Sequence, residues 1–139
     1  MIIFDYYTKQ NQIEIEKDKY KKRENKKWRK LEEKIALKII KKRETVIALG
    51  GGAFINENIR KKVLQSCVSV WLKVNLDKLI KRYRTNNRRP LLNKTKLDAD
   101  VRKIYHLRKK IYSLANFKIS CDNMSKTQIV ERILVLYEN

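Results

Sequence analysis

The sequence predicts an α/β fold in which a parallel sheet lies between two layers of helices. Two continuous apolar runs, residues 45–49 and 67–72, are typical of strands that are buried on both faces of a parallel sheet. Segments with helical spacing of apolar residues lie between these runs and after them, and such alternation favours right-handed crossovers. The length of 139 residues and the 42% hydrophobic content fit one domain with a core, so we expect a single domain over residues 1–139.

The first half of the chain is predicted to form a strand, a helix and a second strand. Residues 2–7 are apolar and aromatic, which indicates a short strand. After a lysine-rich stretch, apolar residues recur at helical spacing from Trp28 to about Arg43 and predict the buried face of a helix. The strand at 45–49 then ends in the chain's only three glycines, Gly50–Gly52. The predicted buried face of the helix consists of Trp28, Leu31, Ile35, Leu37, Ile39 and Ile40.

The second half is predicted to alternate helices with strands. Asn56 and Asn75 are good N-caps for the helices that precede and follow the strand at 67–72. Residues 86–97 include Asn86-Asn87 and the only proline, with few apolar positions, so we expect an exposed mobile segment. The remaining predicted elements are a helix over 98–116, a strand over 117–120, and a helix opened by the capping box Ser125 to Gln128.

The charge of the chain is strongly positive. The sequence has 35 Lys and Arg against 15 Asp and Glu, a net charge of +20. A basic surface attracts polyanions, which makes nucleic-acid binding a hypothesis. Lys, Asn and Ile are abundant together, as happens when the nucleotide composition of a genome biases its codon usage. We favour this origin of the positive charge over nucleic-acid binding. No RNP-type aromatic run, zinc-finger spacing or basic-zipper heptad is present to support nucleic-acid recognition.

The cysteines and the hydropathy pattern favour a reducing, cytoplasmic location. Cys67 and Cys121 each lie in a short apolar run without a Cys-x-x-Cys motif, so we expect buried free thiols. His106 has no partner at metal-ligand spacing and is interpreted as a surface residue. No apolar stretch approaches the roughly 18 residues needed to span a bilayer, and the N-terminus lacks the pattern of a signal peptide.

The glycines follow a predicted buried strand, where ligands bind in many α/β proteins. In an open parallel sheet, ligands bind at the carboxyl ends of the strands, which is where Gly50–Gly52 fall. Glycine permits a positive φ and close approach of a ligand, and the next helix offers N–H groups to anions. Taken alone, the run indicates a tight turn and a ligand site equally well.

Four motifs follow one another along the chain. They are Trp28-Arg29-x-x-Glu32, Val46-Ile47-Ala48-Leu49-Gly50-Gly51-Gly52-Ala53, Arg88-Arg89-Pro90-Leu91-Leu92 with Arg82 before it, and Arg108-x-x-x-Tyr112-x-x-Ala115. Taken together and in order, they resemble the shikimate kinase family, a P-loop group related to the nucleoside-monophosphate kinases. The resemblance extends from about residue 26 to the C-terminus. It implies transfer of the ATP γ-phosphate to the 3-hydroxyl of shikimate, in chorismate and aromatic amino-acid biosynthesis, with ATP and Mg²⁺.

The resemblance implies a role for residues on the shikimate side of the site. Arg29, Gly51 and Arg108 fall on positions that hold shikimate in the family, with Gly50 and Gly52 shaping the turn. The two arginines suit the carboxylate of shikimate, because a planar guanidinium offers a bidentate fork to a carboxylate.

The resemblance also implies a nucleotide side. Arg89 falls on the lid arginine that reaches the ATP phosphates, which makes it the candidate catalytic residue, and Arg82 falls on the arginine near adenine. Residues 86–97 would be the lid that closes over the substrates. Asp5 takes the place of the aspartate that serves magnesium, whereas Tyr7 replaces the substrate-binding aspartate. A tyrosine with a pKa near 10 is a poor base at neutral pH.

One family feature is missing from the sequence. Phosphoryl transfer in this family uses a Gly-x-x-x-x-Gly-Lys-Ser/Thr loop after the first strand, but here every glycine lies at 50–52. We therefore expect the first, central strand of the family sheet to be absent between the strands at 45–49 and 67–73, which would leave two edges to be paired or covered.

The missing loop leaves three interpretations of the chain. We expect a monomer that binds shikimate but has little or no kinase activity alone, with ATP a partner only if the missing segment is supplied. The alternatives are a non-catalytic shikimate- or carboxylate-binding remnant and a basic nucleic-acid-binding protein.

Overall fold

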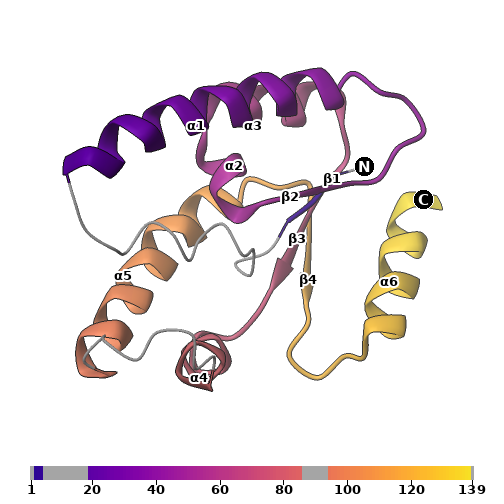
Figure 1. Ribbon diagram of the computed structural model, residues 1–139. Coiled ribbons are helices and arrows are strands. Elements are labelled where there is room, and N and C mark those ends of the chain that lie inside the picture. Colours follow the sequence, from indigo (N-terminus) through magenta and orange to yellow (C-terminus); the bar gives the residue numbers. More distant parts are fainter. Residues whose placement is uncertain (1, 5–18, 86–93, 139) are drawn as a thin grey trace.

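The computed structural model describes residues 2–4, 19–85 and 94–138, with side chains over 26–85 and 98–138 (Figure 1). The strands are β1 (Ile2–Phe4), β2 (Ile47–Leu49), β3 (Ser69–Lys73) and β4 (Phe117–Ser120). The helices are α1 (Lys19–Ile39), α2 (Gly51–Ile55), α3 (Glu57–Ser66), α4 (Leu76–Thr85), α5 (Lys94–Tyr112) and α6 (Lys126–Glu138).

The four strands form one parallel sheet in the order β2-β1-β3-β4, which confirms the predicted α/β class. Strand β1 lies between β2 and β3, and Ile3 pairs with Ala48 on one side and Val70 on the other. The expectation that the central position between these strands would be empty is wrong, because β1 occupies it. The N-terminal strand takes the central place because its backbone groups can then pair on both sides, as buried N–H and C=O groups require.

Helices cover both faces of the sheet. In Figure 1, α1, α2, α3 and α5 lie on one side of the strands and α6 lies on the other. Side chains alternate between the faces along β3, so that Trp71 joins the larger core whereas Val70 joins the smaller core under α6. The larger core contains Ala36, Ile40, Leu49, Ala53, Phe54, Ile59, Val63, Trp71, Val74, Leu79, Tyr105 and Tyr112. The smaller core contains Val70, Ile119 and Ile133.

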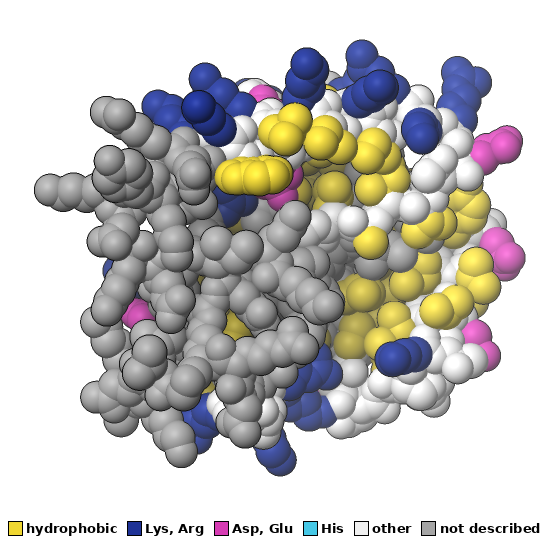
Figure 2. Space-filling view, in the orientation of Figure 1, with side chains coloured by type: hydrophobic (Ala, Val, Ile, Leu, Met, Phe, Trp, Pro, Cys, Tyr) yellow, Lys and Arg dark blue, Asp and Glu magenta, His cyan; other side chains and the backbone are white. Residues whose placement is uncertain are grey.

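The buried face of the long helix α1 matches the prediction only in part. Trp28, Leu31 and Ile35 are 66%, 45% and 48% exposed, and hydrophobic side chains gather at the surface over α1 (Figure 2). Ile40 is buried as predicted, and Ala36, which was not in the predicted face, is buried too. The inner face continues from these two residues, at helical spacing, to Glu33 and Arg29, which are half-buried. Apolar periodicity failed toward the N-terminus of the helix because the inner positions there carry charged side chains.

Asn56 joins three helices at one point. Its side-chain oxygen accepts hydrogen bonds from the backbone N–H groups of Asn58 (2.9 Å) and Ile59 (3.1 Å), so it caps α3 as predicted. Its amide nitrogen donates to Glu33 on α1 at 2.8 Å, and the Asn58 side chain donates to the other oxygen of Glu33 at 2.7 Å. These hydrogen bonds fix the end of α2 and the start of α3 against α1.

Helix α5 begins and ends four residues earlier than predicted. Residues 94–97, expected to be part of a lid, belong to the helix, and residues 86–93 lie outside the described part of the chain. The helix ends early because Asn116 binds the start of β3: its side-chain oxygen accepts from the backbone N–H (3.0 Å) and the hydroxyl (2.7 Å) of buried Ser69.

Other local predictions are confirmed. The Asn75 side chain accepts from the backbone N–H of Asp77 at 2.9 Å. Ser125 and Gln128 form a reciprocal capping box, with distances of 2.8 and 3.2 Å. Both cysteines are free thiols, although each is only half-buried. Within the described residues, every helix is too short or too polar to cross a membrane.

Glu33 is expected to make the stability of the fold sensitive to acid. The hydrogen bonds from Asn56 and Asn58 hold the pKa of its carboxyl below the ordinary value. A carboxyl whose pKa is lowered by folding contributes stability above its unfolded pKa, and this contribution is lost as the pH falls through the folded pKa. Between about pH 5 and pH 3, urea unfolding should therefore show a larger loss of stability for the wild type than for Glu33→Gln.

The control for this prediction is Glu131→Gln, which changes an exposed carboxyl on α6. This variant should lose stability in parallel with the wild type. Identical pH profiles for the wild type and Glu33→Gln would show that the hydrogen bonds to Asn56 and Asn58 contribute nothing to the acid sensitivity.

Candidate functional site

The glycine run lies at the carboxyl edge of the sheet, as predicted. Strand β2 ends at Leu49, Gly50 is the N-cap residue of α2, and Gly51 and Gly52 form the first turn of this short helix. None of the three glycines has a positive φ, and Gly50 has φ −59° and ψ 141°. The turn therefore does not use the left-handed region that glycine permits. The feature that distinguishes Gly52 is the close approach of a side chain.

That side chain is Arg29 of α1. A Cβ atom placed on Gly52 would lie 2.6 Å from Arg29 Nη1, closer than nonbonded atoms approach. Arg29 Nη1 also donates to Glu32 Oε2 at 3.3 Å, and the Arg29 side chain remains 41% exposed. The guanidinium is thus held over the glycine turn by its own helix and is still reached by solvent. Two motifs separated by about twenty residues of chain meet at this point.

The motif on α5 meets the same turn from another side. The hydroxyl of Tyr112 donates a 2.7 Å hydrogen bond to the carbonyl oxygen of Gly51, and the Tyr112 side chain is fully buried. Arg108 precedes Tyr112 by one helical turn, so it lies on the same face of α5, and it is half-buried. The structure therefore brings Arg29, Gly51 and Gly52 together and places Arg108 on the helix that contacts them.

Of the residues predicted for the nucleotide side, only Arg82 lies within the described part of the chain. Arg82 is exposed in the last turn of α4. Ion pairs join α4 to α5, one between Arg84 and Asp98 and the other between Arg102 and Asp77 at 3.7 Å. The candidates Asp5, Tyr7 and Arg89 lie outside the described residues.

Arg60 is a structural residue of the site that the sequence did not reveal. Its Nη1 donates to the carbonyl oxygens of Phe54 (3.3 Å) and Ile55 (2.9 Å), at the end of α2. The last carbonyls of a helix have no intrahelical partner, and a five-residue helix is not stable alone. Arg60 therefore stabilises the helix that carries the glycines. No signal pointed to it, because the sequence predicted a turn where α2 forms.

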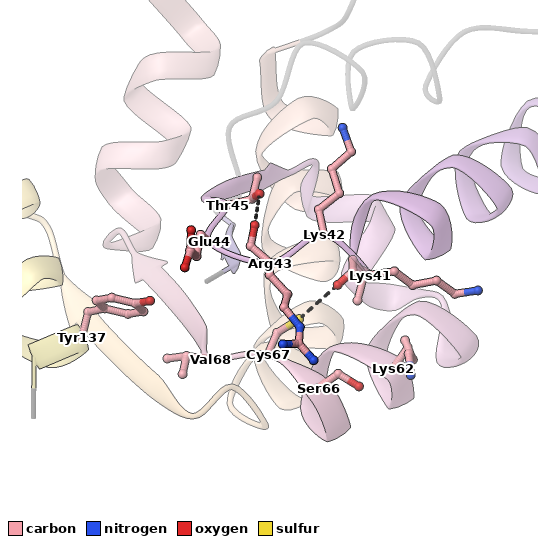
Figure 3. Close-up of a pocket in the computed structure, with 11 residues that line it drawn as sticks. Lys41, Lys42, Arg43, Glu44, Thr45, Lys62, Ser66, Cys67, Val68 and Tyr137 are labelled. Atoms are coloured by element: carbon pink, nitrogen blue, oxygen red, sulfur yellow. Dashed lines mark hydrogen bonds between the residues drawn. The ribbon is translucent and has the colours of Figure 1, made fainter.

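A cavity of about 490 Å³ lies at the opposite, amino edge of the sheet (Figure 3). In Figure 3, Arg43 lies over the end of α3 beside Ser66, while Lys41 and Lys42 point outward. Helices α1 and α3 both end here, and cations near helix C-termini stabilise the partial negative charge of the terminal carbonyls. We interpret this basic cluster as support for the two helix ends. The cavity is lined by Ile40, Lys41, Lys42, Arg43, Glu44, Thr45, Lys62, Ser66, Cys67, Val68 and Tyr137.

The described residues show what the glycine turn presents to solution. Within this part of the chain, no group of three or more His, Cys, Asp or Glu residues could hold a metal ion. The charged group beside the turn is the partly exposed guanidinium of Arg29. A guanidinium is suited to an anion such as a carboxylate.

The sheet order and the covering helices define a P-loop-kinase-like α/β protein. The fold matches a shikimate kinase from Bacteroides thetaiotaomicron with a TM-score of 0.71 and 20% identity, covering 99% of this chain and 83% of that one. It also matches a structure described as shikimate kinase from Acinetobacter baumannii in complex with shikimate, with a TM-score of 0.69 and 20% identity, covering 97% of this chain and 77% of that one.

The sequence gives the family directly. The shikimate kinase family model matches residues 4–138, and the chain belongs to this family. The shikimate kinase of Bartonella henselae is 36% identical over 107 residues, which are 77% of this chain and 51% of that protein. The shikimate kinase of Bartonella quintana is 35% identical over 112 residues, 81% and 53% of the two chains. The chain thus spans about half the length of these curated relatives.

Gly52→Ala is expected to move Arg29 without unfolding the protein. The new Cβ would meet the far end of a flexible side chain, so the guanidinium can shift and the stability cost is small. The Arg29 Nε–H resonance in NMR spectra should move, whereas the unfolding temperature should change by only a few degrees. As a control, Ser125→Ala removes a cap of α6 on the other side of the sheet and should leave the Arg29 resonance in place. An unmoved resonance in Gly52→Ala would show that Arg29 does not rest on the turn.

Proposed function

We propose that this chain forms the shikimate-binding side of a shikimate kinase, which transfers the ATP γ-phosphate to the 3-hydroxyl of shikimate. The observation that carries the proposal is the contact of Arg29 with Gly52 at the carboxyl edge of the sheet. Family membership supports the reaction, and the related protein described in complex with shikimate supports the ligand.

Arg29 and Arg108 bind the carboxylate of shikimate in this proposal. Arg29 is held in place by Glu32 and its side chain remains 41% exposed, so a ligand in solution can reach the guanidinium. Each charge-assisted hydrogen bond of this kind is worth about 1.5–3 kcal/mol, and two parallel bonds also fix the orientation of the ligand. Gly51 and Gly52 supply a surface without side chains against which the ring can lie, and Gly50 starts the turn.

The nucleotide side is proposed from the family resemblance alone. Arg89, within residues 86–97, would reach the ATP phosphates from the lid, and Arg82 would lie near adenine. Asp5 would serve Mg²⁺. The sequence contains no Gly-x-x-x-x-Gly-Lys-Ser/Thr run, so we propose that the 139-residue chain alone binds shikimate and transfers phosphate slowly or not at all.

Shikimate binding is expected to depend on Arg108. Calorimetric titration of the purified chain should give heat on addition of shikimate, and Arg108→Ala should weaken the affinity by at least roughly tenfold, because one charge-assisted hydrogen bond is lost. The matched control is Arg132→Ala, which removes an exposed arginine from α6 on the other side of the sheet and should bind like the wild type.

Two outcomes of this titration would count against the proposal. An absence of heat for the wild type at millimolar shikimate would refute shikimate binding. Equal weakening by Arg108→Ala and Arg132→Ala would show that the net positive charge attracts the ligand and that no specific pocket is involved.

Catalysis is expected to be slow in the chain as given. In a coupled assay with shikimate and Mg-ATP, the turnover of the purified 139-residue protein should fall far below the about 1–100 s⁻¹ that is typical of kinases. Turnover within that range, abolished by Arg108→Ala, would show that this chain holds ATP by other residues. Shikimate binding without turnover would distinguish a binding protein from an active kinase.

A further inference from the structure

We propose that Tyr112 is a positioning residue that sets the orientation of the Gly51–Gly52 backbone and the position of Arg108 relative to it. The inference rests on the proposed function, since it concerns how the shikimate side of the site is held. Tyr112 belongs to a motif of the sequence in which only Arg108 has so far been given a role.

The first observation is a buried, directed hydrogen bond. The Tyr112 hydroxyl donates to the Gly51 carbonyl oxygen at 2.7 Å, the usual length for an O–H donor, and both residues are buried. A hydrogen bond that is removed from water is costly to break, because the buried groups cannot exchange it for a hydrogen bond to water. A purely apolar core position would be filled equally well by phenylalanine.

The second observation is that the ring of Tyr112 is fixed from two sides. Its centroid lies 5.9 Å from Trp71 on β3 and 6.4 Å from Phe54 on α2, with interplanar angles of 68° and 65°. Both are edge-to-face arrangements, the geometry that aromatic pairs favour. All three side chains are fully or almost fully buried. The hydroxyl therefore stands at a position determined by the sheet and α2 together.

The position of the hydroxyl determines the orientation of the glycine turn. A trans peptide is planar, so the Gly51 carbonyl and the Gly52 N–H point in opposite directions. Once Tyr112 holds the carbonyl, the Gly52 N–H faces the start of α2 and the Cα of Gly52 lies under the Arg29 guanidinium. Glycine has no side chain to restrict its backbone, so this hydrogen bond adds to the restriction that the backbone hydrogen bonds of the short helix α2 provide.

The same hydrogen bond links Arg108 to the turn. Arg108 and Tyr112 are four residues apart on α5, so they lie on one face of a rigid helix. Tyr112 thereby fixes the distance between Arg108 and the glycines, and through Gly52 the distance between Arg108 and Arg29. Two arginines can bind one small carboxylate only if their separation is maintained, because preorganisation reduces the cost of binding.

The test is Tyr112→Phe, which removes the hydroxyl and retains the ring. Calorimetric titration should show that the dissociation constant for shikimate rises by roughly tenfold, which corresponds to one lost hydrogen bond. NMR spectra should show that the amide resonances of Gly51 and Gly52 move and exchange faster with solvent.

Two control variants separate positioning from general stability. Val63→Ala truncates a fully buried side chain of α3 in the same core and should lower the unfolding temperature at least as much, but should leave the shikimate affinity and the glycine amides unchanged. Tyr137→Phe removes a hydroxyl from an exposed tyrosine on α6 and should change neither property.

The outcomes distinguish this inference from the proposed function. If the wild type and Tyr112→Phe bind shikimate equally, or if Val63→Ala weakens binding as much as Tyr112→Phe, the positioning role is refuted and shikimate binding stands. If the wild type does not bind shikimate, the proposed function is refuted, and the glycine amide resonances still decide whether Tyr112 orders the turn. If Tyr112→Phe fails to fold, the NMR spectrum of the wild type provides the test. The inference requires a slowly exchanging Tyr112 hydroxyl proton close to the Gly52 amide, and the absence of this proton signal would refute it.

Discussion

The pairing of β1 with both β2 and β3 is the constraint on which the rest of the structure depends. Phe4 of β1 is opposite Leu49 on one side and Trp71 on the other, so these two residues lie at the same level of the sheet. Leu49 is the last residue of β2 before the glycine run, and Trp71 packs against Tyr112. Because a shift of one residue would turn every side chain of a strand to the other face, this register decides whether Tyr112 can reach Gly51.

Helix α1 combines structural and binding roles on one face. Its inner face carries Ala36 and Ile40 near the C-terminus, where it packs on the core, and Glu33 and Arg29 toward the N-terminus. Glu33 holds the junction of α2 and α3, whereas Arg29 reaches the glycine turn. Charged side chains on an inner face provide less hydrophobic stabilisation than apolar ones. That loss is confined to the part of the helix that lies against the candidate site.

Features determined by local interactions could be predicted from the sequence. The caps at Asn56 and Asn75, and the capping box from Ser125 to Gln128, depend on side chains within three residues of the backbone that they bind, and all are present. Strands form within both predicted apolar runs, but only β3 is largely buried, because Ala48 in β2 is exposed and Val46 before it is 63% exposed. The arginines and glycines of the candidate site were found as a combination of motifs and not from any single spacing.

Features that depend on distant partners could not be predicted. The sequence indicated a strand near the N-terminus but not its place in the sheet, which depends on hydrogen bonds to residues 47–49 and 69–71. It indicated a glycine turn, but not that the space beside Gly52 is occupied by the side chain of Arg29. Arg60 was missed because its role exists only once α2 has formed.

The role of each basic residue in this chain is indicated by its surroundings and not by the overall composition. With 35 Lys and Arg, any single basic residue is most simply a solvated surface charge. Arg43, at the amino edge of the sheet, lies beside the ends of two helices, where a positive charge offsets terminal carbonyls. Arg29, at the carboxyl edge, lies over a residue with no side chain, pairs with Glu32 and keeps 41% of its side chain exposed. Both cations therefore have partners within the fold. What distinguishes Arg29 is its place, because it is accessible at the carboxyl ends of the strands, where ligands bind in open parallel sheets.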